Sequence, residues 1–379
     1  MKGKQGLVCM GLLLVLSSCS CHTGKQITAS GLQRKDFQTE VNGQHTDLFT
    51  LSNKQGMEVC ITNYGARVVS ILVPDRNGKR EDVVCGFSTI TEYMEQRQNF
   101  GSTVGRYIGR ILNARFTLDG VEYKLVPNNG KSGHISHGGN PGFADRIWKV
   151  EQADTHRVRL SYLSPDGENG FPGNLKVTLV YSLGEDENAL DLTYEATTDA
   201  PTVLNLSHHS FFNISGNFTK SVEDQQLWVD ADRFTPYDDK KCVTGEYLPV
   251  AGTPLDFRMP HTIGECIDAD HPQLKVVNGY DHTWELNTKG DDTRPAAWVY
   301  DPASGRKMEI FTTEPGMQIY TGNGLKGKMT GKGGIAYPFR SAVCFETMHF
   351  QDSPNQPGFP STVLRPGEVF RSHTVYKFE

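Results

Sequence analysis

"LKVTLVYSL", residues 175–183, has an apolar side chain at every second position along its whole length. Side chains of an extended strand point to opposite faces in turn, so one face of this stretch is fully apolar. The residues on that face are Leu175, Val177, Leu179, Tyr181 and Leu183. The same period recurs in "VRLSYL" (158–163) and "LDLTYEA" (190–196). These stretches predict neighbouring antiparallel strands with one face on a core.

The rest of the chain repeats this pattern of short strands and turns. Clusters of turn residues such as "SPDGENGFPGN" (164–174) separate the alternating runs, and the chain has 39 glycines and 19 prolines. Helical period is scarce; the best candidate is "TITEYMEQRQ" (89–98), where Thr89 and Glu92 predict a capping box. We therefore expect an all-β chain with few short helices. A single large antiparallel β-sandwich over residues 36–379 is favoured over a barrel.

Composition excludes one class of partner. The 379 residues, 37% of them hydrophobic, are enough to bury a large core. The formal charge is −6, with 38 basic and 44 acidic residues interspersed. A phosphate backbone requires a basic patch, and the sequence has none. We expect no nucleic-acid partner.

The first residues predict export. Lys2 and Lys4 precede the apolar run "LVCMGLLLVL" (7–16), which is too short to span a bilayer and is typical of a signal peptide over residues 1–18. Leu16-Ser17-Ser18-Cys19 resembles a bacterial lipobox, in which the cysteine is lipidated, and residues 19–35 would then form a polar tether. We expect an exported lipoprotein that faces the periplasm or the cell surface and meets the membrane only through this anchor. The alternative is a soluble secreted or periplasmic protein.

The cysteines of the body do not form a recognisable framework. They are five in number and widely spaced: Cys60, Cys85, Cys242, Cys266 and Cys344. An odd count argues against a full set of disulfides, although one bridge would be compatible with the spacing. No Cys-x-x-Cys pair indicates zinc. Most of these residues are expected in the core.

Two arginines stand four residues apart in "VGRYIGRILNARF" (104–116). Arg106 and Arg110 would share one face if this segment were a strand. A guanidinium there can hold sugar hydroxyls or a carboxylate, or it can pair with a structural acid. The residues by themselves favour the structural role for either one.

Histidines occur in two other polar stretches. "SGHISHGG" (132–139) places His134 and His137 beside glycines that allow close approach of a ligand. Two histidines three apart could hold a metal, but no third ligand follows at a short fixed spacing. "NLSHHSFFNISG" (205–216) contains His208 and His209, which would face opposite ways on a strand. A metal shared by that pair is therefore not expected.

Two carboxylates complete the candidate site. Asp281 in "NGYDHTWEL" (278–286) reads most simply as a turn former. Glu346 lies within the strongly apolar "AVCFETMHF" (342–350), where burial would raise its pKa towards that of a general base. The chain has no phosphate loop, nucleophile elbow or metal pattern. This inventory suits proton transfer on a neutral, polyhydroxylated ligand.

Eight motifs in order resemble those of the aldose 1-epimerase, or galactose mutarotase, family. They run from about residue 36 to the C-terminus: "VGRYIGRI", "SHGG", "SPDGENGFPGNLKV", "NLSHHSFFN", "NGYDH", "EPGMQIYTGN", "CFET" and "NQPGFPSTVLRPGE". The resemblance implies a mutarotase-like supersandwich that interconverts the α and β anomers of free aldohexoses such as glucose and galactose. It implies His209 as general acid and Glu346 as general base. The residues that would hold the sugar are Arg110, His137, Asp281 and Gln318.

The resemblance also sets expectations for partners and departures. It implies a small-molecule aldose as ligand, no cofactor or metal for the chemistry, and a monomer; a structural calcium in loops such as "PDGEN" is an open alternative. The family commonly has asparagine where this chain has Gly109 and His208, which puts the epimer preference and the pKa of His209 in question. We expect the carboxylate of Glu346 to raise the pKa of His209.

Two other functions fit parts of this pattern. A carbohydrate-binding protein would keep the sandwich and the sugar contacts without the pairing of His209 with Glu346. A hexose-phosphate epimerase would need further cations at the site, for which Arg106 is the one spare candidate.

Overall fold

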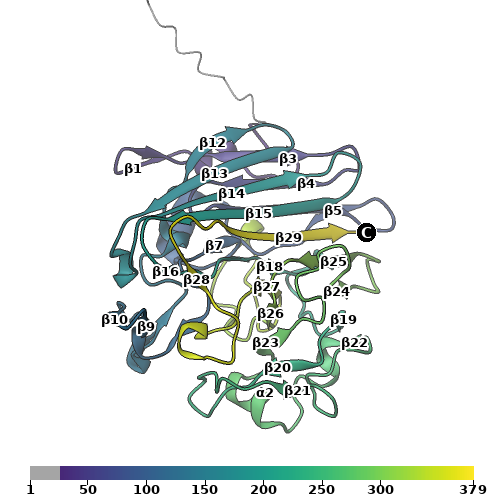
Figure 1. Cartoon of the computed structure of the whole chain (residues 1–379). Helices are drawn as coiled ribbons and strands as arrows, with labels where there is room; N and C mark the ends of the chain where they lie inside the picture. Colours follow the sequence, from purple (N-terminus) through teal and green to yellow (C-terminus); the bar gives the residue numbers. More distant parts are fainter. Residues whose placement is uncertain (1–25) are drawn as a thin grey trace, which may run out of the picture.

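The strand predicted at residues 175–183 lies inside a nine-stranded antiparallel sheet. The computed structural model describes residues 26–379; the predicted signal peptide and lipobox lie outside this range. In Figure 1 the long strands β13, β14, β15 and β29 run side by side across the upper half of the molecule. In order across the sheet, its strands are β12 (Lys149–Ala153), β13 (Arg157–Ser164), β14 (Leu175–Leu183), β15 (Ala189–Thr198), β29 (Phe370–Phe378), β25 (Lys307–Thr312), β24 (Ala297–Tyr300), β19 (Gln226–Val229) and β22 (His261–Thr262).

Two smaller sheets lie against the nine-stranded sheet. The first has the order β18 (Phe211–Phe212), β27 (Val343–Met348), β26 (Gly316–Tyr320), β23 (Asp281–Glu285), β20 (Arg233–Thr235) and β21 (Leu248–Pro249). The second has the order β3 (Leu48–Ser52), β4 (Glu58–Thr62), β5 (Arg67–Pro74) and β6 (Arg80–Asp82). Five antiparallel pairs complete the strands: β1 (Glu40–Val41) with β2 (Gln44–His45), β7 (Ser102–Val104) with β17 (Ser207–His209), β8 (Arg110–Ile111) with β11 (Ile135–Ser136), β9 (Arg115–Leu118) with β10 (Val121–Lys124), and β16 (Thr202–Val203) with β28 (Val363–Leu364).

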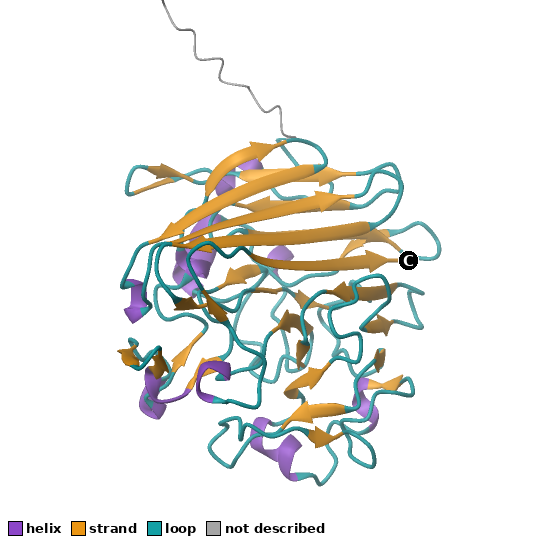
Figure 2. Cartoon of the chain, in the orientation of Figure 1, coloured by secondary structure: helices purple, strands orange, loops and turns teal. Residues whose placement is uncertain are grey.

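Helices are few and short (Figure 2). The predicted helix is α1 (Ile90–Gln96), and its capping box between Thr89 and Glu92 is present. The second is α2 (Pro272–Val277). The 3-10 turns are η1 (Arg34–Phe37), η2 (Leu112–Ala114), η3 (Gly130–Ser132), η4 (Phe143–Asp145), η5 (Glu168–Gly170), η6 (Ile263–Glu265), η7 (Lys332–Gly334) and η8 (Ser353–Asn355). The expected mostly-β architecture with few helices is confirmed.

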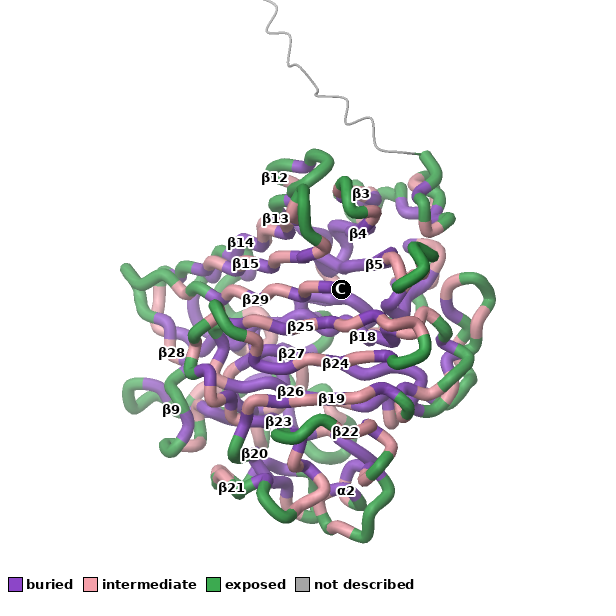
Figure 3. Tube along the Cα trace, turned by 90° about the vertical axis from the view of Figure 1, so that its right-hand side faces the viewer, coloured by how far each residue is buried: buried purple, intermediate pink, exposed green. Residues whose placement is uncertain are grey.

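The core lies between the sheets, where their apolar faces meet. The alternating residues of β14 and β15 pack with apolar residues of β4, β5, β26 and β27 in one cluster, and Figure 3 shows these strands buried and the connecting loops exposed. Hydrogen bonds also cross the core: the Tyr376 hydroxyl donates to the Phe345 carbonyl at 3.0 Å, and the Tyr181 hydroxyl to the Ala66 carbonyl at 2.7 Å. These contacts hold the smaller sheets, and hence the site that they carry, against the large one.

The N-terminal boundary differs from the one expected. Within the described part of the predicted tether, Thr28 and Leu32 are buried, and the Ala29 N–H donates to Glu58 at 2.7 Å. The packed body thus begins before residue 36. Among residues 26–379, no helix has the length and apolar character needed to cross a membrane.

The five cysteines of the body are all free thiols, so none of them forms the single bridge that the spacing allowed. Four are buried and Cys266 is partly exposed, as expected for residues that serve mainly in packing.

Candidate active site

Three adjacent strands carry three of the predicted residues on one face. In the ladder of β27 and β26, Glu346 lies directly opposite Gln318. In the next ladder Gln318 lies opposite Thr283, two residues after Asp281 on β23. Because side chains two apart on a strand share a face, Glu346, Gln318 and Asp281 point the same way. The Gln318 amide donates to Asp281 Oδ1 at 2.6 Å, which fixes both side chains.

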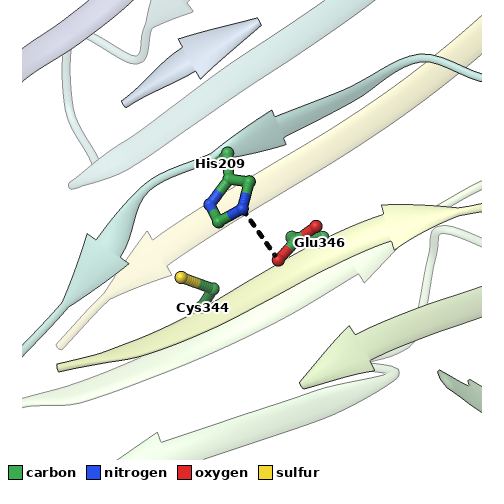
Figure 4. Close-up of side chains that lie close together, drawn as sticks. All are labelled: His209, Cys344 and Glu346. Atoms are coloured by element: carbon green, nitrogen blue, oxygen red, sulfur yellow. Dashed lines mark ion pairs between the residues drawn. The ribbon is translucent and has the colours of Figure 1, made fainter. Parts of the chain in front are cut away.

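His209 reaches Glu346 from a different strand. It is the last residue of β17, and its Nε2 lies 3.4 Å from Glu346 Oε1, as Figure 4 shows. Only 7% of the His209 side chain and 4% of that of Glu346 are exposed. The imidazole stacks on the ring of Phe211 with 5.0 Å between centroids. The proposed acid and base are therefore adjacent, buried and held in place by packing.

The pair of β8 with β11 brings the two other predicted sugar-binding residues. Arg110 lies opposite Ser136, and His137 is the next residue. The His137 N–H donates to the Gly109 carbonyl at 2.9 Å, and its ring meets that of His209 edge-on with 5.5 Å between centroids. The Arg110 guanidinium lies 6.0 Å from the centre of the Tyr237 ring.

All six predicted residues line one cavity of about 250 Å³. This volume lies just below the usual range of about 300–1,000 Å³ for small-molecule pockets, which suits a single sugar ring. Sequence reasoning singled out none of the other side chains that line the cavity, although four of them (Ser136, Phe211, Tyr320 and Met348) lie inside stretches quoted above. These missed residues are Gln98, Asn99, Ser136, Phe211, Tyr320, Met348 and Gln351.

Burial sets the protonation of the central pair. Desolvation raises the pKa of Glu346 well above its usual range, and the charge of Asp281 adds to this shift, as the sequence predicted for the carboxylate. Desolvation likewise lowers the pKa of His209 well below its usual value, and His137 contributes. The expectation that Glu346 would raise the pKa of His209 is wrong for the substrate-free site, because burial disfavours both ions. In the empty cavity, burial thus favours the neutral forms, a protonated carboxyl group on Glu346 and an unprotonated imidazole on His209, over the ion pair.

Burial and neighbouring charges also shift the pKa values of the other polar groups in the cavity. Burial, with help from Arg110, lowers the pKa of His137 to about 4, so this imidazole is neutral at neutral pH. Burial raises the pKa of Asp281, although Arg110 and Gln318 oppose the shift. Desolvation works against the charge of Arg110, but Tyr237 and Asp281 raise its pKa overall. Arg110 is thus the fixed positive charge of the cavity.

Arg106 does not share a face with Arg110. The expected strand does not include it, since β8 begins at Arg110. The buried guanidinium of Arg106 instead donates to Ser164 Oγ at 2.7 Å and to the carbonyls of Ser164, Pro165 and Pro172. Arg106 is structural, as the residues favoured, whereas Arg110 lines the cavity.

The remaining candidate histidines, His134 and His208, do not line the cavity. The Nδ1 of His134 accepts a hydrogen bond from the Asn113 N–H at 2.9 Å. His208 points away from the cavity into the core, with Nε2 2.7 Å from Ser210 Oγ. Opposite orientation of His208 and His209 is confirmed. Asp281 begins strand β23 and lines the cavity, so the interpretation as a turn former is wrong.

One cluster among residues 26–379 could hold a metal ion. Figure 4 shows its members, His209, Cys344 and Glu346, whose ligand atoms all lie within 4.8 Å of one another. Nitrogen, sulfur and carboxylate oxygen form a ligand set of the kind that binds zinc or cadmium. Two of the three are the proposed acid and base, so an ion bound there would compete with catalysis.

The loop in which the sequence allowed a calcium is already engaged with protein donors. Asp166 accepts from the Gly173 N–H at 2.6 Å. Glu168 accepts from Arg146 at 2.6 Å and from the Tyr162 hydroxyl at 2.7 Å.

Comparison with known proteins shows the family to which the chain belongs. The family model of aldose 1-epimerases matches residues 47–377, which is most of the chain. The chain belongs to the aldose 1-epimerase family. It is 39% identical to a galactose mutarotase of Sus scrofa over 330 residues, covering 87% of this chain and 93% of that protein. It is 36% identical to an aldose 1-epimerase of Escherichia coli (strain K12) over 339 residues, covering 89% and 96%.

Solved structures agree with this family assignment. An aldose epimerase homologue from C. elegans superposes with a TM-score of 0.81 at 31% identity, covering 88% of this chain and 99% of that one. A galactose 1-epimerase from Lactobacillus acidophilus NCFM gives a TM-score of 0.78 at 29% identity, covering 90% and 97%. The mutarotase-like fold is therefore confirmed. As a member of the aldose 1-epimerase family, the chain is an isomerase that interconverts the anomers of an aldose.

Proposed function

We propose that the protein interconverts the α and β anomers of free aldohexoses such as glucose and galactose, with Glu346 as the base and His209 as the acid. The observation that carries these roles is the 3.4 Å contact between His209 Nε2 and Glu346 Oε1 in the wall of the cavity. Arg110, His137, Asp281 and Gln318 surround this pair and offer donors and acceptors to hydroxyl groups.

The proton shared by the pair makes the chemistry self-contained. Transfer of that proton from Glu346 to His209 gives a carboxylate and an imidazolium without exchange with solvent. The carboxylate then takes the proton of the anomeric hydroxyl while the imidazolium protonates the ring oxygen. The bond between the anomeric carbon and the ring oxygen breaks, and an aldehyde forms. Each positioned acid or base typically contributes about 10²- to 10⁴-fold to such a step.

Reclosure gives the other anomer by the same two groups. Rotation about the bond between the first two carbons presents the other face of the aldehyde to the hydroxyl that becomes the ring oxygen. His209 takes the proton of that hydroxyl as the ring bond forms, and Glu346 returns its proton to the anomeric oxygen. The pair ends with the proton count that it had at the start.

The charges of the cavity favour a neutral sugar over a sugar phosphate. Among its described lining residues, Arg110 is the single lysine or arginine, and Arg106, the spare cation, is buried against carbonyl groups elsewhere. A phosphate group needs further cations or backbone donors. We expect glucose 6-phosphate to relax at the buffer rate under conditions where glucose relaxes faster.

Polarimetry separates the enzyme from a non-catalytic sugar-binding protein. Freshly dissolved α-glucose, α-galactose, xylose and arabinose should reach equilibrium faster with the purified protein than in buffer. A bell-shaped pH profile is expected, because the pair must hold one proton: a second proton abolishes the base, and loss of the only proton abolishes the acid. The buffer rate for all four sugars would leave only the binding function. A flat profile between about pH 4 and 9 would contradict the acid and base roles.

Export as a monomeric lipoprotein forms a separate part of the proposal. It is supported by Lys2, Lys4, the apolar run 7–16 and the lipobox-like Leu16-Ser17-Ser18-Cys19. Labelled fatty acid should be incorporated into the wild-type protein and not into Cys19→Ala, which should appear in the soluble fraction. Unlabelled wild type in the soluble fraction would favour simple secretion. Light scattering on the soluble body should give the mass of one chain, and a dimer mass would contradict the monomer.

A further inference from the structure

At Gly109 the wall of the cavity has no side chain. This residue has a φ of +75°, a conformation that glycine adopts readily and asparagine tolerates. A Cβ atom placed on it would lie 2.5 Å from Cγ and 3.1 Å from Cδ of Gln351, and 3.3 Å from Cε of Met348. The Gln351 side chain therefore fills the space in front of residue 109. A side chain at 109 and the present position of Gln351 exclude each other.

The carboxamide of Gln351 sits among the sugar-binding residues. It lines the cavity and is 4% exposed. Its Nε2 donates to the Tyr237 hydroxyl at 2.6 Å and, at 3.4 Å, to Gln318 Oε1. Its Oε1 accepts from the backbone N–H of Arg110 at 3.3 Å and from Arg110 Nη1 at 3.4 Å. Gln351 thus connects two residues proposed to hold the sugar, Arg110 and Gln318.

Only one of these four hydrogen bonds is short. The bond to Tyr237 orients the side chain, whereas the other three lie at the long limit for hydrogen bonds. Long bonds are weak, so a sugar hydroxyl can replace one of them at small cost. A carboxamide has both donors and acceptors, which allows it to respond to the position of a hydroxyl group.

We propose that Gln351 is a specificity-determining residue of the aldose site: it supplies the polar contact on the side where Gly109 has no side chain, and it positions Arg110. The proposal rests on the aldose function proposed above. It predicts that the preference between sugars that differ in one hydroxyl, such as glucose and galactose, depends on residues 109 and 351 as a pair.

Three variants test this pairing by polarimetry, with kcat and KM measured for both sugars. Gln351→Leu keeps the bulk and removes the amide, so kcat/KM should fall about 3- to 10-fold for one sugar more than for the other, mainly through KM, as for one lost hydrogen bond. Gly109→Asn alone should raise KM for both sugars, because its side chain collides with Gln351. Gly109→Asn combined with Gln351→Ala should recover most of that loss. Gln356→Leu is the matched control and should keep the wild-type ratio, since Gln356 bonds Asp352 and does not line the cavity.

The outcomes distinguish this inference from the proposed function. Wild type at the buffer rate would refute the aldose function itself. Active wild type with an unchanged ratio of kcat/KM in Gln351→Leu would overturn the role of Gln351 alone. If Gln351→Leu does not fold, the double variant decides: no recovery over Gly109→Asn would overturn the proposal, and recovery with a changed ratio would support it.

Discussion

His208 is predicted to control stability in acid and to leave catalysis unaffected. The ring is 3% exposed and lies beside Tyr181, with Nε2 2.7 Å from Ser210 Oγ. Burial lowers its pKa to about 3 in the folded protein. In the unfolded chain the pKa of histidine is about 6.5, so between these values the unfolded state binds the proton and folding becomes less favourable as the pH falls.

The size of this effect follows from the two pKa values. Between about pH 7 and pH 5, His208 should account for about 2 kcal/mol of lost unfolding free energy. His208→Asn removes the titrating group, so its unfolding free energy should fall by about 2 kcal/mol less than that of wild type over this interval. At pH 7 the variant itself should be less stable by about 1–3 kcal/mol, because buried packing and a hydrogen bond are lost.

Urea unfolding at the two pH values measures the stability difference, and polarimetry measures kcat/KM. His45→Asn is the control, because the side chain of His45 is 79% exposed. Equal losses of stability in wild type and His208→Asn would refute the argument from burial. A displaced pH profile of kcat/KM in His208→Asn would show instead that His208 tunes His209.

Three further predictions concern other parts of the molecule. Arg106→Met should lower the unfolding free energy, measured in urea, by about 3–5 kcal/mol, because it leaves buried carbonyl groups unpaired. The preference between glucose and galactose should stay unchanged. Wild-type stability of this variant would contradict the structural role of Arg106. Cd²⁺ should inhibit mutarotation competitively with the sugar, and Cys344→Ala should weaken this inhibition because a soft ligand is lost; equal inhibition of both proteins would argue against the cluster. His373 bonds Asp191 and Asp292, which raises its pKa to about 9 despite burial. Its stabilising effect should be complete below about pH 6.5 and disappear as the pH rises through 9. The difference in unfolding free energy between wild type and His373→Gln should therefore shrink over that range. A difference that grows with pH would contradict this prediction.

Local pattern was sufficient for the strands and the capped helix. Leu175–Leu183 alternates over nine residues and forms β14 as predicted, because one face must meet the core. Thr89 and Glu92 cap α1 through contacts three residues apart, which a sequence shows directly. The prediction that Arg106 and Arg110 share the face of one strand was wrong, because Arg106 lies between β7, which ends at Val104, and β8, which begins at Arg110. The side chain of Arg106 bonds residues more than fifty positions away, which a local pattern does not show.

The site was predictable only where a motif marked it. Glu346 stood out as a carboxylate in an apolar run, and the family resemblance supplied His209 and the four residues proposed to hold the sugar. Gln351 carried no local signal, since its proposed role depends on the missing side chain of Gly109, a residue distant in the sequence whose space the Gln351 side chain fills. The pKa of His209 was misjudged because the sequence shows a charged neighbour but not the depth of burial.

If Glu346 and His209 act as one acid–base unit, the effects of replacing them should not add, and a double-mutant cycle measures this coupling. Polarimetric relaxation of α-galactose should be measured for wild type, Glu346→Gln, His209→Asn and the double variant, with sugar binding by calorimetry as the check that each site is intact. Each single variant should lose at least about 100-fold in kcat. The double variant should lose little more than the worse single one, because groups that act together are not additive. Full activity in Glu346→Gln, or losses that multiply in the double variant, would show that the two residues do not act as one unit.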